Sequence, residues 1–244
     1  MGLRLDKVLL SRGLVGTRSR ARDLIVRGAV TVDGAVETKP GAVVREDAPI
    51  ALSEDADYVS RGSLKLVAAL DAFGFDPAGL RALDVGASTG GFTEVLLRRG
   101  AAHVVAVDVG HGQLDPTLAD DPRVTQHEGR DVRTLTAEDL GAPPGAIVAD
   151  VSFISLEKAL PAALALAAPG AWLVALIKPQ FEAGRDAVGK GGLVRDAAVR
   201  DAQAEKIATW LGGLAGWRVV GLIPSPVAGG SGNWEFLIGA VFDG

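Results

Sequence analysis

The stretch Leu83–Gly91, LDVGASTGG, constrains the fold of this 244-residue chain more than any other segment. A short apolar run ends in an acid, continues through a turn with three glycines, and leads into the helical pattern GFTEVLLRRG. Glycine allows a tight turn and a close approach of the backbone to a ligand, which then sits near the helix N-terminus. This strand–turn–helix unit is typical of α/β sheets that bind nucleoside cofactors at the carboxyl ends of their strands.

The chain from residue 60 onward alternates between strand and helix patterns. We predict helices at 62–75, 91–99, 156–167 and 197–214, and strands at 81–86, 103–110, 123–128, 146–153, 172–179, 217–227 and 233–242. Repeated strand–helix units predict a mostly parallel, doubly wound α/β sheet. The apolar run 159–177 approaches the length of a membrane span, but Pro169 and Gly170 divide it, so we expect a helix, a turn and a buried strand there.

Residues 1–55 form a separate predicted domain, followed by a linker at 56–60 and a larger domain at 61–244. Helical patterns at 3–13 and 17–30 precede strand patterns at 30–37 and 42–54. Residues 1–45 hold nine Lys and Arg against four Asp and Glu, whereas the whole chain has a net charge of -5. A basic module on an acidic chain indicates an anionic partner such as RNA, although a solvated helix face would show the same imbalance.

Composition excludes several kinds of site. The chain has no cysteine, so disulfides, Cys-ligated zinc and thiolate nucleophiles are ruled out. The three histidines form no ligand-spaced cluster, and we expect no metal. The first residues lack the apolar core of a signal peptide, and we expect a cytoplasmic protein.

The glycine turn also restricts the cofactor. The run from Gly86 misses the dinucleotide pattern G-x-G-x-x-G, and the chain has no G-x-x-x-x-G-K-[ST] phosphate loop. Asp108 ends the next strand, 24 residues after Asp84, where an acid can accept the ribose hydroxyls of a nucleoside. The pattern resembles the S-adenosylmethionine pocket of Rossmann-like methyltransferases, and the alternative is an ordinary tight turn.

Four charged residues occupy positions that suggest a role in catalysis or binding. Lys178 and Asp150 each end an apolar strand, Lys65 lies on the first helix of the large domain, and Glu235 falls within the last predicted strand. A strand-end Asp is often a helix cap and a helix lysine is often solvated. A carboxylate in an apolar strand is harder to dismiss, because buried acids are rare unless paired.

The motifs SRGSLKL, LDVGASTGGFTEVLL, AVDVGHGQL, ADVSFISL, IKPQFE and GNWEFL occur in this order, and the chain thereby resembles the TlyA (hemolysin A) family of ribosomal RNA 2'-O-methyltransferases, related to the FtsJ type. Residues 4–34 resemble an S4 RNA-binding module. The resemblance implies a Rossmann-like S-adenosylmethionine-dependent methyltransferase sheet with a small N-terminal α+β S4-type domain.

The resemblance also implies roles for residues. The catalytic tetrad is Lys65, Asp150, Lys178 and Glu235. The S-adenosylmethionine site comprises Asp84, Gly86, Ser88, Gly90, Gly91 and Asp108, with Glu128 or Asp131 toward the adenine amine. RNA phosphates are expected at Arg4, Lys7, Arg12, Arg18, Arg20, Arg22 and Arg27. The chain departs from the family pattern at GHG, residues 110–112, where a Tyr is expected in place of His111, and at the linker DADYV.

The implied reaction is methylation of a cytidine ribose 2'-hydroxyl in 16S or 23S ribosomal RNA, with Lys178 taking the hydroxyl proton or stabilising the developing alkoxide. The expected partners are ribosomal subunits, with no stable membrane association and a monomeric protein. Two alternatives remain open: a membrane-active haemolysin, and a non-catalytic RNA-binding assembly factor. A cytosine-C5 enzyme is excluded by the absent cysteine.

Overall fold

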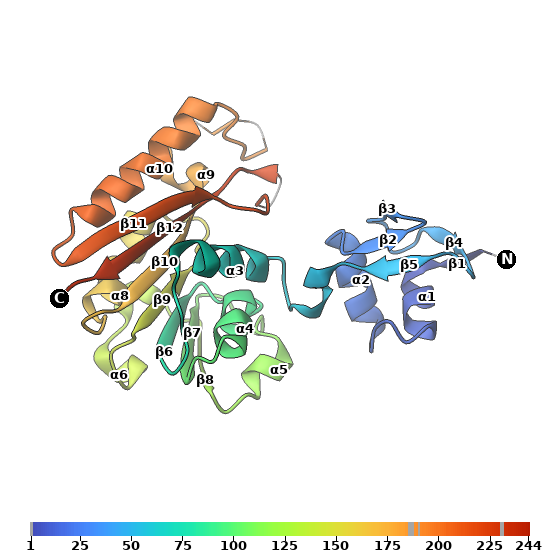
Figure 1. Cartoon of the computed structure of the whole chain (residues 1–244), viewed down its shortest axis with the longest axis horizontal. Coiled ribbons are helices and arrows are strands. Elements are labelled where there is room, and N and C mark those ends of the chain that lie inside the picture. Colours follow the sequence, from blue (N-terminus) through green and yellow to red (C-terminus); the bar gives the residue numbers. More distant parts are fainter. Residues whose placement is uncertain (1, 185–187, 190, 230–231) are drawn as a thin grey trace. The chain divides into compact units, whose positions relative to one another are not determined.

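The computed structural model describes residues 2–184, 188–189, 191–229 and 232–244. The chain divides into two compact units, Met1–Arg61 and Gly62–Gly244, each with its own elements (Figure 1). The functional domain boundaries given above stay a prediction. No helix in the described part of the chain is long and apolar enough to cross a membrane.

The first unit combines two helices with two small antiparallel sheets. Its elements are β1 Gly2–Arg4, α1 Leu5–Ser11, α2 Arg18–Val26, β2 Val30–Val32, β3 Ala35–Val36, β4 Val43–Arg45, β5 Ile50–Leu52 and the 3₁₀ turn η1 Glu54–Asp57. Strand β1 pairs with β4, and the other sheet has the order β3-β2-β5. Leu5 and Leu9 of α1 and Leu24 and Ile25 of α2 meet in the core, each at most 1% exposed.

The helix predicted at 3–13 is wrong at its start. Residues Gly2–Arg4 are extended and pair with Val43–Arg45, so the helix begins only at Leu5. The local pattern could not reveal this, because the strand partner lies about 40 residues away in sequence. The second helix begins at Arg18, where the Thr17 side chain accepts a hydrogen bond from the Arg20 amide at 3.1 Å.

The second unit is a mixed α/β sheet. Its strands are β6 Arg81–Val85, β7 His103–Asp108, β8 Val124–Glu128, β9 Ala146–Ala149, β10 Trp172–Ile177, β11 Trp217–Pro224 and β12 Phe236–Phe242. Its helices are α3 Gly62–Phe73, α4 Gly91–Arg98, α5 Pro116–Ala119, α6 Ala137–Leu140, α7 Leu156–Ala159, α8 Pro161–Ala165, α9 Pro179–Glu182 and α10 Ala197–Gly212, with the 3₁₀ turn η2 Val132–Thr134. Among the described residues the strand order is β11-β12-β10-β9-β6-β7-β8.

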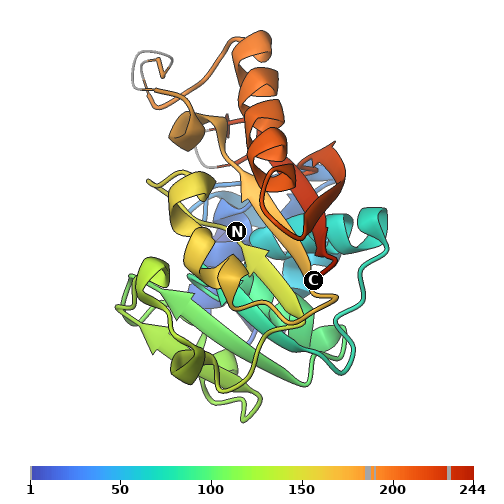
Figure 2. The ribbon, with the colours of Figure 1, turned by 90° about the vertical axis from the view of Figure 1, so that its left-hand side faces the viewer.

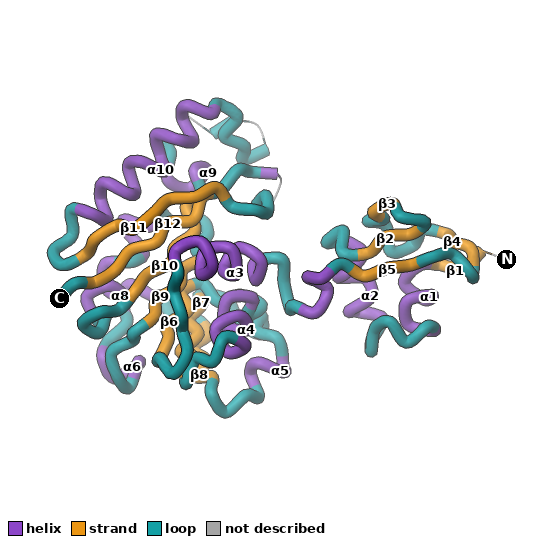
Figure 3. The backbone as a smooth tube through the Cα atoms, in the orientation of Figure 1, coloured by secondary structure: helices purple, strands orange, loops and turns teal. Residues whose placement is uncertain are grey.

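Strands β8, β7, β6, β9 and β10 run parallel, and β12 and β11 are antiparallel additions at one edge. Helices and strands alternate along most of this unit (Figure 3). Helices α3 and α4 pack together on one face of the sheet, and α7, α8 and α10 lie on the other (Figure 2). The central strands are buried on both faces, as in doubly wound folds, so their carboxyl ends meet at one edge.

Two further sequence predictions require correction. The helix predicted at 156–167 is divided into α7 and α8, because Pro161 cannot continue α7 and instead occupies the first turn of α8. The last strand begins at Phe236 rather than at residue 233, so Glu235 precedes β12. The backbone of Glu235 still accepts a hydrogen bond from Ser225 at 2.9 Å, whereas its side chain turns toward α3.

Candidate active site

The turn after β6 needs glycine at Gly86. Its φ is +84°, and a Cβ atom there would lie 2.6 Å from the carbonyl oxygen of Asp150. Gly90 has φ +94° and begins α4, and a Cβ atom there would collide with Leu118 and Leu114. Both positions therefore exclude other side chains, but for different reasons: Gly86 brings β6 and β9 together, and Gly90 lets the α5 region pack on the turn.

Asp108 at the end of β7 fixes two loops at once. One carboxylate oxygen accepts the Ser88 amide at 2.8 Å, and the other accepts the Gly110 amide at 2.7 Å. Ser88 has a positive φ of +48°, unusual for a non-glycine residue, and its hydroxyl donates to Gln113 at 3.2 Å. Because a carboxylate has about four acceptor sites, Asp108 keeps capacity for further hydroxyl donors.

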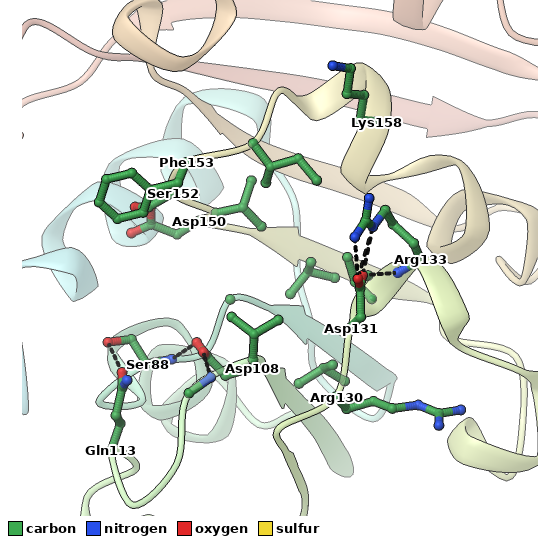
Figure 4. A pocket seen from close by; sticks show the side chains of 18 residues that line it. Ser88, Asp108, Gln113, Arg130, Asp131, Arg133, Asp150, Ser152, Phe153 and Lys158 are labelled. Atoms are coloured by element: carbon green, nitrogen blue, oxygen red, sulfur yellow. Dashed lines mark hydrogen bonds and ion pairs between the residues drawn. The ribbon is translucent and has the colours of Figure 1, made fainter.

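A cavity of about 680 Å³ opens between these loops and the ends of β6, β7 and β9. Figure 4 shows Ser88, Asp108 and Gln113 on one side of it, and Asp150, Ser152 and Phe153 across from them. This volume is in the range of small-molecule and cofactor sites. Of the predicted cofactor residues, four line the cavity: Gly86, Ser88, Asp108 and Asp131.

The other predicted cofactor residues lie elsewhere. Gly90 and Gly91 are at the start of α4 and are not among the lining residues, and Glu128 accepts the Gln113 amide at 3.2 Å outside this cavity. Asp131 lines the cavity, but its carboxylate already holds Arg133, with Nη2 at 2.5 Å, and this hydrogen bond lowers the pKa of Asp131. An adenine amine would share Asp131 with that arginine.

Asp84 lies inside β6, next in sequence to the cavity-lining Val85, and is 0% exposed. One of its oxygens accepts the Thr93 hydroxyl at 2.7 Å, and Oδ1 has no hydrogen-bond partner in the described part of the chain. Burial raises the pKa of Asp84 to about 7; the Thr93 hydrogen bond opposes that rise, and the charges of Asp150 and Asp108 add to it. Asp84 is therefore a buried acid whose charge no cation balances in the described part of the chain.

Lys178 and Asp150 form an ion pair at the ends of adjacent strands. Lys178 follows β10 and Asp150 follows β9, and the Lys178 Nζ lies 2.6 Å from an Asp150 oxygen. The same Nζ donates to the Ser152 hydroxyl at 2.9 Å, a contact that the sequence motifs did not single out. Asp150 and Ser152 both line the cavity. Their side-chain oxygens therefore hold the Lys178 ammonium group at the edge of the cavity.

Lys65 and Glu235 form the second pair. The Lys65 Nζ donates to Glu235 Oε2 at 2.6 Å, and both side chains are buried, at 9% and 2% exposure. The antiparallel register pairs Phe236 with Ile177, so the residues before β12 lie beside those after β10. The four predicted catalytic residues thus occur as two ion pairs around the ends of β9, β10 and β12.

Family models match segments in both units of the chain. The model of the FtsJ-like methyltransferase family matches residues 58–242, which span the cavity and both ion pairs. The chain belongs to the FtsJ-like methyltransferase family. The S4 domain model matches residues 3–50. The resemblance inferred from the sequence motifs and the predicted fold class are confirmed.

Relatives cover nearly the whole chain. It is 47% identical to a Mycobacterium tuberculosis protein named 16S/23S rRNA (cytidine-2'-O)-methyltransferase TlyA, over 96% of this chain and 88% of that one. It is 38% identical to Hemolysin A of Brachyspira hyodysenteriae, over 96% of this chain and 98% of that one. A solved structure from Streptococcus thermophilus, described as a candidate hemolysin, is 39% identical with a TM-score of 0.76, covering 99% and 88% of the two chains.

Phe153 is a feature of this FtsJ-like unit that sequence reasoning missed. It is 90% exposed, has a positive φ of +66°, and lines the cavity three residues after Asp150. Its ring lies 5.0 Å from that of Phe181 in α9, and Glu182 of the same helix accepts the Leu156 amide at 2.9 Å. These contacts hold an exposed aromatic ring at the cavity edge. An aromatic residue just after a strand-end acid was the available signal.

In the S4-type unit, several predicted RNA-contacting arginines serve the fold. Arg4 and Arg18 bind the buried Asp6, at 3.0 and 3.1 Å. Arg12 donates to the carbonyl oxygens of Ala48 and Glu46. The positions of the remaining four differ: Arg20 and Arg27 donate to the Tyr58 carbonyl oxygen at 2.7 and 3.1 Å, whereas Lys7 and Arg22 are exposed on α1 and α2.

Proposed function

We propose that this protein is an S-adenosylmethionine-dependent methyltransferase acting on a ribose 2'-hydroxyl of ribosomal RNA. The observation that carries the proposal is the Lys178–Asp150 ion pair, 2.6 Å apart at the edge of a cofactor-sized cavity in an FtsJ-like unit. From the similarity to the Mycobacterium protein we infer that the target is a cytidine in 16S or 23S ribosomal RNA.

The cavity fits S-adenosylmethionine. Gly86 clears the backbone where a side chain would meet Asp150, and Asp108 offers free acceptor capacity to ribose hydroxyls. Asp108 lines the cavity with a carboxylate, whose negative charge suits a cation. We assign Gly86, Ser88, Asp108 and Asp131 to direct cofactor contact, and Asp84, Gly90 and Gly91 to shaping the turn. When bound, this cofactor supplies a methyl group activated by its sulfonium.

The protein's contribution is to position the hydroxyl and to manage its proton. Lys178 Nζ is held by Asp150 and Ser152, so it meets an incoming hydroxyl in one orientation. Whether Nζ accepts the proton or stabilises the oxygen as its negative charge develops, both roles need the nitrogen at this place. Lys65 and Glu235 are buried in a mutual ion pair, and we assign them to holding the segment before β12 beside Lys178.

Phe153 supplies a surface for the target nucleotide. Unpaired RNA bases stack on aromatic rings, and this ring is exposed at the cavity edge beside Asp150 and Ser152 (Figure 4). A base resting on Phe153 would bring its ribose toward Lys178. The first unit adds phosphate contacts from Lys7 and Arg22, which position RNA without reading its sequence. We place the reaction in the cytoplasm, on ribosomal subunits, by a monomer.

The test is methyl transfer from labelled S-adenosylmethionine to purified unmodified ribosomal subunits. We expect label in RNA that blocks alkaline hydrolysis at one bond, because a methylated 2'-oxygen cannot attack the adjacent phosphate. Label that leaves every bond cleavable would indicate base methylation instead. Cofactor binding without label on either subunit would favour a non-catalytic assembly factor, and leakage of liposomes by the purified protein would favour a haemolysin.

A further inference from the structure

Trp234 is placed unlike the other tryptophans of this chain. It is 60% exposed, whereas Trp172 and Trp217 are 6% exposed and Trp210 is half-buried. A tryptophan contributes to folding mainly through the large apolar area that it buries. Trp234 leaves most of this area in solvent, so its position is better explained by a binding partner than by the fold.

The backbone on both sides of Trp234 is anchored. Asn233 is 5% exposed, its Nδ2 donates to the Gly192 carbonyl oxygen at 3.0 Å, and its backbone oxygen accepts the Gly229 amide at 2.9 Å. On the other side, Glu235 is held by Lys65 at 2.6 Å. An exposed ring on an anchored backbone loses little conformational freedom when a partner stacks on it.

A cation lies over this ring. The guanidinium carbon of Arg200, in the first turn of α10, is 5.2 Å from the centroid of Trp234. An aromatic face next to an arginine is the combination that proteins use for single-stranded nucleic acid, with a base on the ring and a phosphate on the guanidinium. A partner protein with an apolar surface would not need the arginine.

The position of Trp234 relates it to the proposed reaction centre. Strand β10 lies between β9 and β12 in the sheet, and Lys178 follows β10. Phe153 follows β9, and Trp234 precedes β12, whose first residue pairs with Ile177. The two exposed aromatic residues therefore belong to the segments next to the two strands that flank β10, the strand whose end carries Lys178.

We propose that Trp234 and Arg200 form a platform for an unpaired nucleotide of the RNA substrate that neighbours the methylated one. Trp234 stacks on its base and Arg200 contacts its phosphate. This inference rests on the proposed function, because it assumes RNA at Lys178, and it deepens that function by adding a second nucleotide-binding position. The substrate class that follows is RNA with at least two splayed or single-stranded nucleotides at the modified position.

The test compares Trp234→Ala, Trp234→Phe and Arg200→Gln in the full chain with Val220→Ala, an exposed apolar residue of β11, as the matched control. Methyl transfer to ribosomal subunits gives KM and kcat, and titration gives the affinity for S-adenosylmethionine. We expect the KM for RNA to rise about 5- to 100-fold in Trp234→Ala, with kcat and cofactor affinity nearly unchanged. Trp234→Phe should keep most of the affinity, and Arg200→Gln should reduce the slope of log RNA affinity against log salt by about 0.7.

Tryptophan fluorescence provides a second readout that loss of folding would not imitate. A base stacked on Trp234 should quench the wild-type emission when RNA is added, and the Trp234→Phe variant should lose this quench while still binding RNA. An unchanged KM in Trp234→Ala, in an enzyme that methylates RNA normally, would overturn the platform and leave the proposed function standing. A wild-type protein that methylates no RNA would overturn the proposed function itself.

Discussion

Asp6 in the first unit and Asp84 in the second are both 0% exposed, yet their surroundings act on them in opposite directions. Asp6 is covered by Arg4 and Arg18, whose side chains are 46% and 52% exposed. The hydrogen bond from Arg4, with a further contribution from Arg18, lowers the pKa of Asp6 to about 2. Asp84 accepts hydrogen bonds from Thr93, and burial raises its pKa to about 7.

The pKa values of the two acids differ because the two units surround them differently. The first unit is small, and it ties β1, α1 and α2 together with a charged pair that stays near solvent. The second unit has a large apolar core, and it buries Asp84 in β6 without a counter-charge among the described residues. The ion pairs of Asp6 therefore stabilise the fold of the first unit, whereas we assign Asp108 and the Lys178–Asp150 pair of the second unit to cofactor and substrate. The buried Lys65–Glu235 pair is an intermediate case, because it is a structural pair beside the proposed site.

The largest effect is expected at this intermediate pair. Lys65→Met leaves Glu235 buried without a cation, which should lower the free energy of unfolding of the second unit by about 3–5 kcal/mol. All four tryptophans belong to this unit, so their fluorescence in urea follows its unfolding alone. The double variant Lys65→Met/Glu235→Leu should recover most of the loss. A loss below about 1 kcal/mol in the single variant would mean that water reaches the pair.

The next effect concerns Asp84 and pH. The folded unit holds the Asp84 proton up to a pKa of about 7, whereas the unfolded chain releases it near the ordinary pKa of 3.8. Stability should therefore fall as pH rises from about 4 to 7, by at most about 1.4 kcal/mol per pH unit, and then level off. In Asp84→Asn this fall should be reduced, as measured by urea unfolding across that range. If stability fell equally with pH in the wild type and in Asp84→Asn, the raised pKa of Asp84 would be contradicted.

Asp6 should show the opposite sign. Its folded pKa lies below the unfolded value, so its contribution is present above about pH 4 and is lost as pH falls toward 2. Asp6→Asn should cost about 1 kcal/mol at pH 7, a value reduced by the solvent around the two arginines. Amide hydrogen exchange in α1 reports on this unit. If Asp6→Asn were more stable than wild type at pH 7, the ion pairs of Asp6 with Arg4 and Arg18 would be destabilising the first unit.

The smallest effects are expected at Lys7 and Arg22, which we predict to contact RNA phosphates without holding the fold. Substituting either with Ala should reduce the slope of log affinity against log salt by about 0.7–0.9, with no change in unfolding. The control is Lys39→Ala, which changes an exposed lysine of the same unit that lies outside α1 and α2. Arg20→Ala should instead loosen residues 56–58, because Arg20 binds the carbonyl oxygens of Ala56 and Tyr58.

The sequence was sufficient to predict the sheet and the strand-end residues of the second unit. Parallel strands bring their carboxyl ends to one edge, so Asp150 and Lys178 could be expected together from the lengths of two apolar runs. The partners of individual side chains could not be predicted from the sequence in the same way. Nothing local indicates that Lys65 pairs with Glu235, 170 positions later, or that Arg20 turns toward Tyr58 instead of an RNA partner.

Exposure was also hidden from the sequence. Phe153 and Trp234 are aromatic residues within predicted strands, and such residues are usually expected in a core. Their exposure goes with the positive φ at Phe153 and with the late start of β12, at Phe236 instead of residue 233, neither of which the local pattern indicates. The sequence pattern thus placed Phe153 and Trp234, the two residues that we assign to RNA bases, inside strands, whereas both lie outside the strands of the structure.

The measurement that tests the central claim most directly is single-turnover methyl transfer by Lys178→Met beside Lys206→Met. Lys206 pairs with Glu157 at 2.7 Å on the surface of α10, so it is a matched lysine in an ion pair outside the cavity. We predict a rate loss of about 100-fold or more for Lys178→Met, with cofactor affinity retained, and a rate within about twofold of wild type for Lys206→Met. A near-normal rate in Lys178→Met would contradict the assignment of the reaction to the Lys178–Asp150 pair.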